Sequence, residues 1–244
     1  MGSLRDAFDD RLAEIEAYLV FLDGLEGEVR RTGAPQLGSE GPVITVDQQR
    51  ILYSSVYLQL YNLVESTITR CLDAVCDAAI AGGRWKPGDL SLELRREWVR
   101  STARTHVEMT DENRLRAAVE LVGHLVDALP VKPFKVEKAG GSWDDVMIEG
   151  ITARIGMALR ISQPVFQGVK QHIREDRGAL ALIALLRNNL AHGSLSFVEC
   201  GQNVVVNQLR DLKNRAALYL GEVVDAFETW VASYEFLLPE RRPA

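Results

Sequence analysis

Cysteine is scarce in this 244-residue chain, and the three present, Cys71, Cys76 and Cys200, have no paired spacing. An odd number of unpaired cysteines gives no disulfide framework and favours a reducing, cytoplasmic location. The first residues include Asp6 and Asp9 but no basic segment followed by an apolar one. We therefore expect no signal peptide.

Long apolar runs and excess positive charge are also lacking. No stretch approaches the roughly 18 apolar residues of a membrane-spanning helix, so no membrane association is expected. The net charge of −6 argues against a protein that coats nucleic acid non-specifically, because that mode needs many phosphate-neutralising side chains. A local phosphate site stays open, since arginine outnumbers lysine by 22 to 6 and its fork fits phosphate well.

Several motifs with strong local signatures are missing. The histidines, His106, His124, His172 and His192, lie far apart and form neither His-Glu-x-x-His nor a Cys/His pattern. Gly-x-Ser-x-Gly, the Walker loop and Gly-x-Gly-x-x-Gly are absent as well. The sequence therefore predicts no metal site and no cofactor, and it supports neither a nucleophile-elbow hydrolase nor a P-loop nucleotide hydrolase.

Apolar residues recur instead at three- and four-residue spacing, which predicts an all-α fold. We expect one helical-bundle domain over residues 1–244, in which a partly helical segment at about 84–141 is inserted in or appended to the bundle. Residues 163–177 are either a short helix or a loop with a helical turn. The expected helices cover about 4–30, 47–81, 89–104, 110–129, 142–159 and 178–191, and a last one is capped by Asn207.

Arg96, Arg100 and Arg104 recur every fourth residue and would form a basic stripe on one helix face. Such a stripe could guide RNA, but more often it is a solvated face balanced by neighbours such as Glu93 and Glu97. We favour the second interpretation.

Glu65 lies between apolar residues of the long helix predicted at 47–81. One interpretation is a boundary carboxylate that reaches solvent or pairs with an arginine, since carboxylates are rarely buried unpaired. The other is a supporting group that holds an active-site arginine in place.

The most unusual stretch follows the apolar run at 180–186, where Arg187, Asn188 and His192 close a helix ahead of Gly193. A five-residue separation on an ideal helix places two side chains about 140° apart. A glycine after the histidine marks the helix end, where the backbone can turn and bring His192 toward Arg187. Complementarity to the helix dipole and C-capping produce the same residues without catalysis, so this alternative stays open.

Arg187-Asn188-x-x-x-His192, at the end of an apolar helix in an all-α chain, resembles the Arg-x4-6-His signature of the HEPN superfamily. The flanking residues 185–197, and the segment 57–66 in the early helix, are similar to the bacterial MAE-type branch. This resemblance implies a HEPN-like helical bundle and a metal-independent endoribonuclease. It also implies a homodimer in which Arg187 and His192 of both protomers meet at one composite cleft.

Metal-free RNA cleavage uses the neighbouring 2′-OH as nucleophile and needs proton transfer and a cation for the phosphorane. In this scheme His192 is the base or acid, Arg187 stabilises the phosphate charge, and Asn188 and Glu65 are supporting residues. Many HEPN proteins act as toxins paired with an antitoxin or in phage defence, so RNA and such a partner protein are expected. Ser194 stands where relatives inactivated by a nucleotidyltransferase carry tyrosine, so regulation by adenylylation there is not expected. The alternatives are a non-catalytic HEPN binding or dimerisation module and a purely structural helical protein.

Overall fold

The computed structural model describes residues 3–38, 40–103, 108–138 and 140–243, and these residues confirm the all-α fold class. Within these ranges extended backbone forms isolated bridges, such as Gln36 with Val43, and no sheet. None of the described helices is both long enough and apolar enough to cross a membrane. The chain clusters into two compact units, to which α2 and α9 both contribute.

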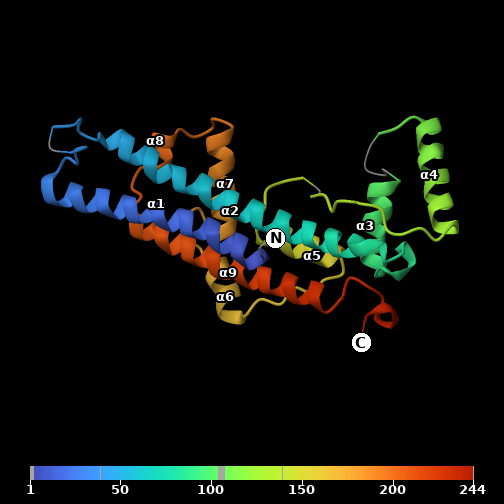
Figure 1. The fold of residues 1–244 in the computed structure, drawn as a ribbon. Helices are drawn as coiled ribbons and strands as arrows, with labels where there is room; N and C mark the ends of the chain where they lie inside the picture. The colour runs from blue at the N-terminus through green and yellow to red at the C-terminus, as the bar shows by residue number, and fades with distance from the viewer. Residues whose placement is uncertain (1–2, 39, 104–107, 139, 244) are drawn as a thin grey trace. The chain divides into compact units, whose positions relative to one another are not determined.

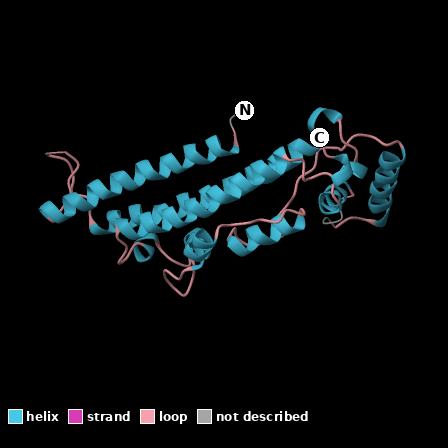
Figure 2. Cartoon of the chain, turned by 90° about the horizontal axis from the view of Figure 1, so that it is seen from below, coloured by secondary structure: helices cyan, strands magenta, loops and turns pink. Residues whose placement is uncertain are grey.

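Unit 1 comprises residues 1–67, 142–145 and 161–222 within the described ranges. In it α1 runs alongside the first part of α2 and of α9 (Figures 1 and 2). The Tyr18 hydroxyl donates to the Leu52 carbonyl, and Lys213 pairs with Glu16. Its helices are α1 (Leu4–Thr32), α2 (Val46–Ile80, shared), α6 (Gln163–Lys170), α7 (Ala179–Ala191), α8 (Phe197–Cys200) and α9 (Val206–Ala232, shared).

The first helix shows why the sequence folds in this way locally. Ser3 and Asp6 form a capping box at its start, and Gly33, in the left-handed region at φ 76°, ends it. Its buried side chains recur at helical spacing and face the core of unit 1. They are Phe8, Ile15, Leu19, Leu22 and Leu25.

Unit 2 comprises residues 68–141, 146–160 and 223–244 within the described ranges. The predicted insertion at about 84–141 therefore lies here, although the arrangement as one domain with an insertion stays a prediction. Trp98 is fully buried at its centre. Besides the ends of α2 and α9, its helices are η1 (Ala81–Gly83), η2 (Pro87–Asp89), α3 (Leu92–Thr102), α4 (Asp111–Val126), α5 (Asp145–Arg154) and η3 (Pro239–Arg241).

Two predicted helix boundaries are wrong. The helix expected at 142–159 runs only from Asp145 to Arg154. Its late start agrees with the hydrogen bond that the Trp143 N–H donates to the distant Tyr61 hydroxyl at 3.2 Å. Asn207 is not the cap of α9 but lies inside its first turn. The Gln208 side chain accepts from the Val205 N–H there, and the helix begins at Val206, two residues earlier than a cap at Asn207 predicts.

Residues 163–177, predicted as either a short helix or a loop, form a short helix followed by a turn. Residues 163–170 form α6, and the chain from 171 to 178 is a turn in which Arg174 and Arg177 form an isolated bridge.

Candidate functional site

Helix α7 carries the predicted site residues in its last turns, in unit 1. The helix is held by buried apolar side chains along most of its length, among them Leu182, Leu186 and Leu190. It starts after Gly178, where a Cβ would lie 2.4 Å from the Val169 carbonyl oxygen. Glycine thus permits the close approach of α6 that fixes where α7 begins. Figure 1 shows α7 crossing the direction of α2.

The end of α7 is where the sequence predicted it. The His192 N–H still donates to the Asn188 carbonyl at 2.9 Å, and Gly193 then adopts φ 71°. The Leu195 N–H folds back to the Asn189 carbonyl at 3.2 Å. The left-handed glycine therefore ends the helix directly after the histidine.

Arg187 lies on an aromatic platform. Its guanidinium carbon is 3.9 Å from the centre of the Tyr61 ring, and this ring is only 1% exposed. Arginine stacks well on aromatic faces because its guanidinium is planar and weakly hydrated. The stacking fixes the plane of the guanidinium while about 30% of the side chain stays exposed.

Two predicted supporting residues contact this arginine. Arg187 Nη1 donates to Asn188 Oδ1 at 2.9 Å, and Arg187 Nη2 lies 3.8 Å from Glu65 Oε2. Glu65 is 43% exposed, so it is a boundary carboxylate that both reaches solvent and pairs with an arginine. At this distance and exposure the ion pair contributes little, and stacking with the hydrogen bond positions Arg187.

A second layer joins this arginine to a segment far away in the sequence. Asn188 Nδ2 donates to Ser142 Oγ at 2.6 Å, and the Tyr61 hydroxyl accepts from the Trp143 N–H. Sequence reasoning took Ser142 only as a helix start and linked neither Ser142 nor Trp143 to the site. The position of Tyr61 four residues before Glu65 did place both on one face of α2, and that signal could have found the tyrosine.

His192 takes no part in these contacts. His192 is exposed, and in the described part of the chain its imidazole makes no hydrogen bond or ion pair with Arg187 or any other side chain. The expectation that the helix end turns the histidine toward the arginine therefore stays a prediction, although the two side chains form no hydrogen bond or ion pair within the described residues. His192 keeps near-helical angles, φ −93° and ψ 0°, and the reversal starts only at Gly193.

A cavity of about 590 Å³ with a mixed polar and apolar lining also lies in unit 1, between α2, α7 and the start of α9. Its wall includes Tyr57, whose pKa burial raises to about 12, together with Arg174, Asn203 and Asn207. None of Arg187, Asn188, His192 or Glu65 lines this cavity. In the described residues no group of three or more His, Cys, Asp or Glu side chains is arranged to hold a metal ion.

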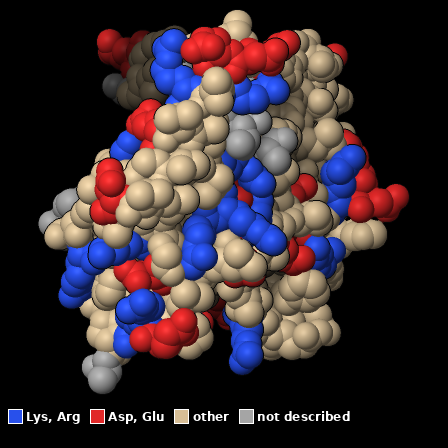
Figure 3. Space-filling view, turned by 90° about the vertical axis from the view of Figure 1, so that its right-hand side faces the viewer, with Lys and Arg blue, Asp and Glu red and all other residues tan. Residues whose placement is uncertain are grey.

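The described part of the basic stripe on α3, in unit 2, is balanced by acidic side chains. Arg100 pairs with Glu97 at 2.8 Å, and Glu97 also pairs with Arg154. Arg104 lies outside the described residues. Figure 3 likewise shows basic and acidic side chains interspersed on the face that it views. These contacts agree with the interpretation as a solvated, charge-balanced face.

Comparison with known proteins identifies one family for nearly the whole chain. The model of HEPN_MAE_28990, described as MAE_28990-like HEPN, matches residues 2–236. This match includes both units and all four predicted site residues. No curated protein and no solved structure matches the chain.

Proposed function

Because the chain belongs to the HEPN_MAE_28990 family, we propose that it is a metal-independent endoribonuclease whose site is completed by a second protomer. Arg187 of one copy and His192 of the other are the proposed catalytic residues. The observation that carries the proposal is the state of these two side chains. Arg187 is held in place and partly exposed, whereas His192 is exposed and has no side-chain partner among the described residues.

The arrangement of Arg187 suits phosphate. Its guanidinium has five N–H donors, and within the described residues one of them is used by Asn188. The others can fork onto two phosphate oxygens, and the charge that grows on those oxygens in the phosphorane strengthens these bonds. Because stacking on Tyr61 fixes the guanidinium before substrate arrives, little reorganisation is needed during the reaction.

His192 supplies proton transfer. Histidine ordinarily titrates near neutral pH, so the same side chain can accept the 2′-OH proton or protonate the leaving 5′-oxygen. The 2′-oxygen attacks the adjacent phosphorus, the bond from phosphorus to the 5′-oxygen breaks, and the products carry a 2′,3′-cyclic phosphate and a 5′-OH. This in-line attack needs a flexible backbone, so single-stranded or loop RNA is the expected substrate.

The local charge supports RNA binding in an acidic protein. Residues 177–198 contain no aspartate or glutamate, and Glu65 is the acidic residue that contacts Arg187 among the described ones. We further propose that the enzyme works in a toxin–antitoxin or phage-defence setting, in which a partner protein restrains it.

A non-catalytic HEPN module that binds a partner is the second candidate, and the lack of any hydrogen bond or ion pair between Arg187 and His192 within the described residues favours it. Burial of these residues would also favour this candidate, but neither the Arg187 nor the His192 side chain is buried. In this case the chain would keep the dimer and the helix-end arginine without turnover.

The test is incubation of single-stranded RNA with the protein in excess chelator. We expect wild type to give products ending in 2′,3′-cyclic phosphate, and Arg187→Ala and His192→Ala each to lose about 100-fold or more in rate. His172→Ala, which removes another exposed histidine, is the matched control and should cleave like wild type. Activity unchanged in His192→Ala would refute the assignment of the histidine, and no cleavage by wild type would favour the binding module.

A further inference from the structure

Helix α4 of unit 2 exposes an apolar stripe. Leu115, Val119, Val122 and Val126 are 60%, 62%, 57% and 76% exposed. Their spacing of four, three and four residues places them within about 60° of one another around the helix. An amphipathic helix normally buries such a stripe against its own domain, so this one is the reverse of the usual arrangement.

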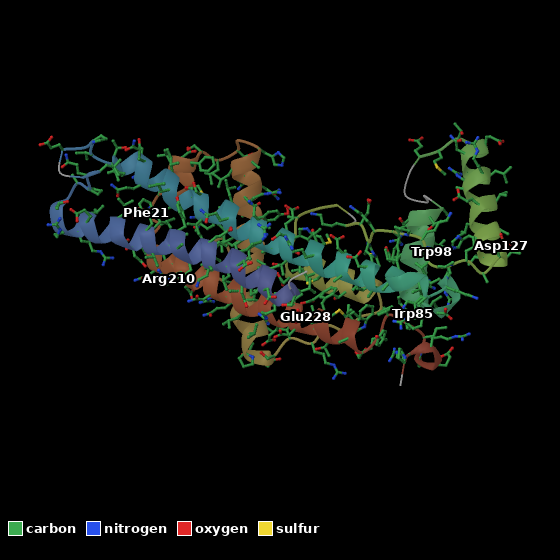
Figure 4. All side chains as sticks on the ribbon, viewed as in Figure 1. Phe21, Trp85, Trp98, Asp127, Arg210 and Glu228 are labelled. Carbon is green, nitrogen blue, oxygen red and sulfur yellow. The ribbon has the colours of Figure 1, made fainter. Side chains whose placement is uncertain are left out.

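The packed side of α4 lies opposite the stripe. His124 is the buried residue of this helix. Its ring packs 5.4 Å from that of Trp98, labelled in Figure 4, and its Nε2 is 2.7 Å from the Pro130 carbonyl oxygen. On an ideal helix His124 points about 180° away from the middle of the stripe. The attachment of α4 to unit 2 therefore leaves the whole stripe uncovered.

The uncovered area is large enough for a specific contact. Leu125, about 90° from the middle of the stripe, and Leu129, beyond the end of α4, are also exposed, at 47% and 43%. Together the six side chains expose roughly 600 Å² on one chain, at the upper end for the largest patch of an ordinary monomer. Two such faces bury about 1,200 Å², the lower limit of standard protein interfaces.

We propose that this face is covered by α4 of a second copy of the chain, in an antiparallel helix pair. The spacing of four, three and four reads the same from either end, so the stripe is complementary to itself under a two-fold axis. Val119 of one copy then meets Val122 of the other, and Leu115 meets Val126. The four apolar layers fit together without a gap or a shift.

The charges beside the stripe favour this direction. Arg116 and Asp127 lie on the same flank, about 20° apart around the helix, one near each end of α4. Antiparallel pairing brings Arg116 of each copy opposite Asp127 of the other and forms two symmetric ion pairs. Parallel pairing about a two-fold axis would place the Arg116 of one copy and the Asp127 of the other on opposite flanks of the helix pair, so neither ion pair could form.

This contact includes none of the residues proposed for RNA cleavage, so either proposal can fail alone. The test uses Val119→Cys and Val122→Cys in the full chain under mild oxidation. A mixture of the two variants should form a disulfide-linked dimer at least five-fold faster than either variant alone, because only the mixture places the new thiols opposite each other. The native Cys71, Cys76 and Cys200 are buried, which keeps the background low.

Val20→Cys, at an exposed valine of α1 in unit 1, measures random collision. Cross-linking of the mixture no faster than this control would overturn the proposal. Faster cross-linking of Val119→Cys alone than of the mixture would overturn the antiparallel arrangement.

A charge exchange gives an independent measurement. Arg116→Asp should slow cross-linking of the mixture about two- to five-fold, as expected for an exposed ion pair, and adding Asp127→Arg should restore it. Failure of the second change to restore the rate would count against the pairing of these residues.

Discussion

At the scale of single residues, the site depends on how one arginine is held. Arg187 has a flat, buried ring beneath it, an amide beside it and a carboxylate at the margin. Tyr61 performs two tasks, because its ring positions the guanidinium and its hydroxyl anchors the Trp143 N–H. The tyrosine thereby links the stability of unit 1 to the geometry of the proposed site.

Replacing Tyr61 separates these two tasks. Tyr61→Phe keeps the ring and removes the hydroxyl that accepts from the Trp143 N–H, so we expect a loss of about 1–2 kcal/mol in unfolding free energy and RNA cleavage within a few-fold of wild type. Tyr61→Leu also removes the stacking, and cleavage should fall at least ten-fold further. Urea unfolding and cleavage rates of both variants measure this, and equal rates would show that the ring does not position Arg187.

At the scale of elements, helices with strong periodicity could be predicted and features set by distant residues could not. The sequence placed α1, α2, α7 and α9 to within a few residues, since their apolar spacing is local information. It misplaced the start of α5, next to which a hydrogen bond joins residues 82 apart in the sequence.

The same limit applied to the site. Arg187, Asn188 and Glu65 were predicted and lie together, because two are adjacent and the third faces them from a periodic helix. Ser142 was missed because a serine in an irregular segment carries no sign of the helix that it will contact. The direction of the His192 side chain could not be derived, since a glycine tells where a helix ends but not which way the preceding side chain points.

The start of α7 gives a test at this scale. Gly178→Ala would press a Cβ against the Val169 carbonyl, and we expect a loss of about 1–3 kcal/mol in unfolding free energy. Gly168→Ala is the matched control in α6, where nothing lies within 4 Å of the added carbon. It should be neutral or stabilise by up to about 1 kcal/mol, because alanine favours helix over glycine. An equal loss in both variants would contradict the close-approach explanation.

At the scale of the whole molecule, the stability of the protein should depend on acid through the contact between α1 and α9. Hydrogen bonds from Lys213 and Arg210 (labelled in Figure 4) lower the pKa of Glu16 below its ordinary 4.5. A carboxyl group with a lowered folded-state pKa stabilises the fold fully above its unfolded value, and this stabilisation is lost as pH falls through the folded value.

Glu16→Gln should therefore lower the unfolding free energy at pH 7 and flatten its fall with acid below about pH 4.5. Urea unfolding at a series of pH values measures this, and added salt should weaken the effect because these groups are partly exposed. Glu14→Gln, at an exposed glutamate of the same helix, is the control. Parallel curves for wild type and Glu16→Gln would contradict the role of this ion-pair cluster.

Oligomerisation is the feature of the whole molecule on which the proposed function depends. Within one protomer the described residues show no hydrogen bond or ion pair between Arg187 and His192, and the proposed site takes its histidine from a second chain. The α4 contact offers one route by which copies associate, whereas the composite site makes a separate claim about which residues face each other.

Mixing two inactive variants tests that claim most directly. Arg187→Ala and His192→Ala, purified separately, are combined under conditions that allow subunits to exchange, and RNA cleavage in chelator is measured. If Arg187 of one protomer works with His192 of the other, a mixed dimer has one intact site, and the mixture should regain about a quarter of wild-type activity. If both residues act within one chain, no mixed dimer has an intact site, and a mixture as inactive as its components, with subunit exchange verified, would contradict the composite site.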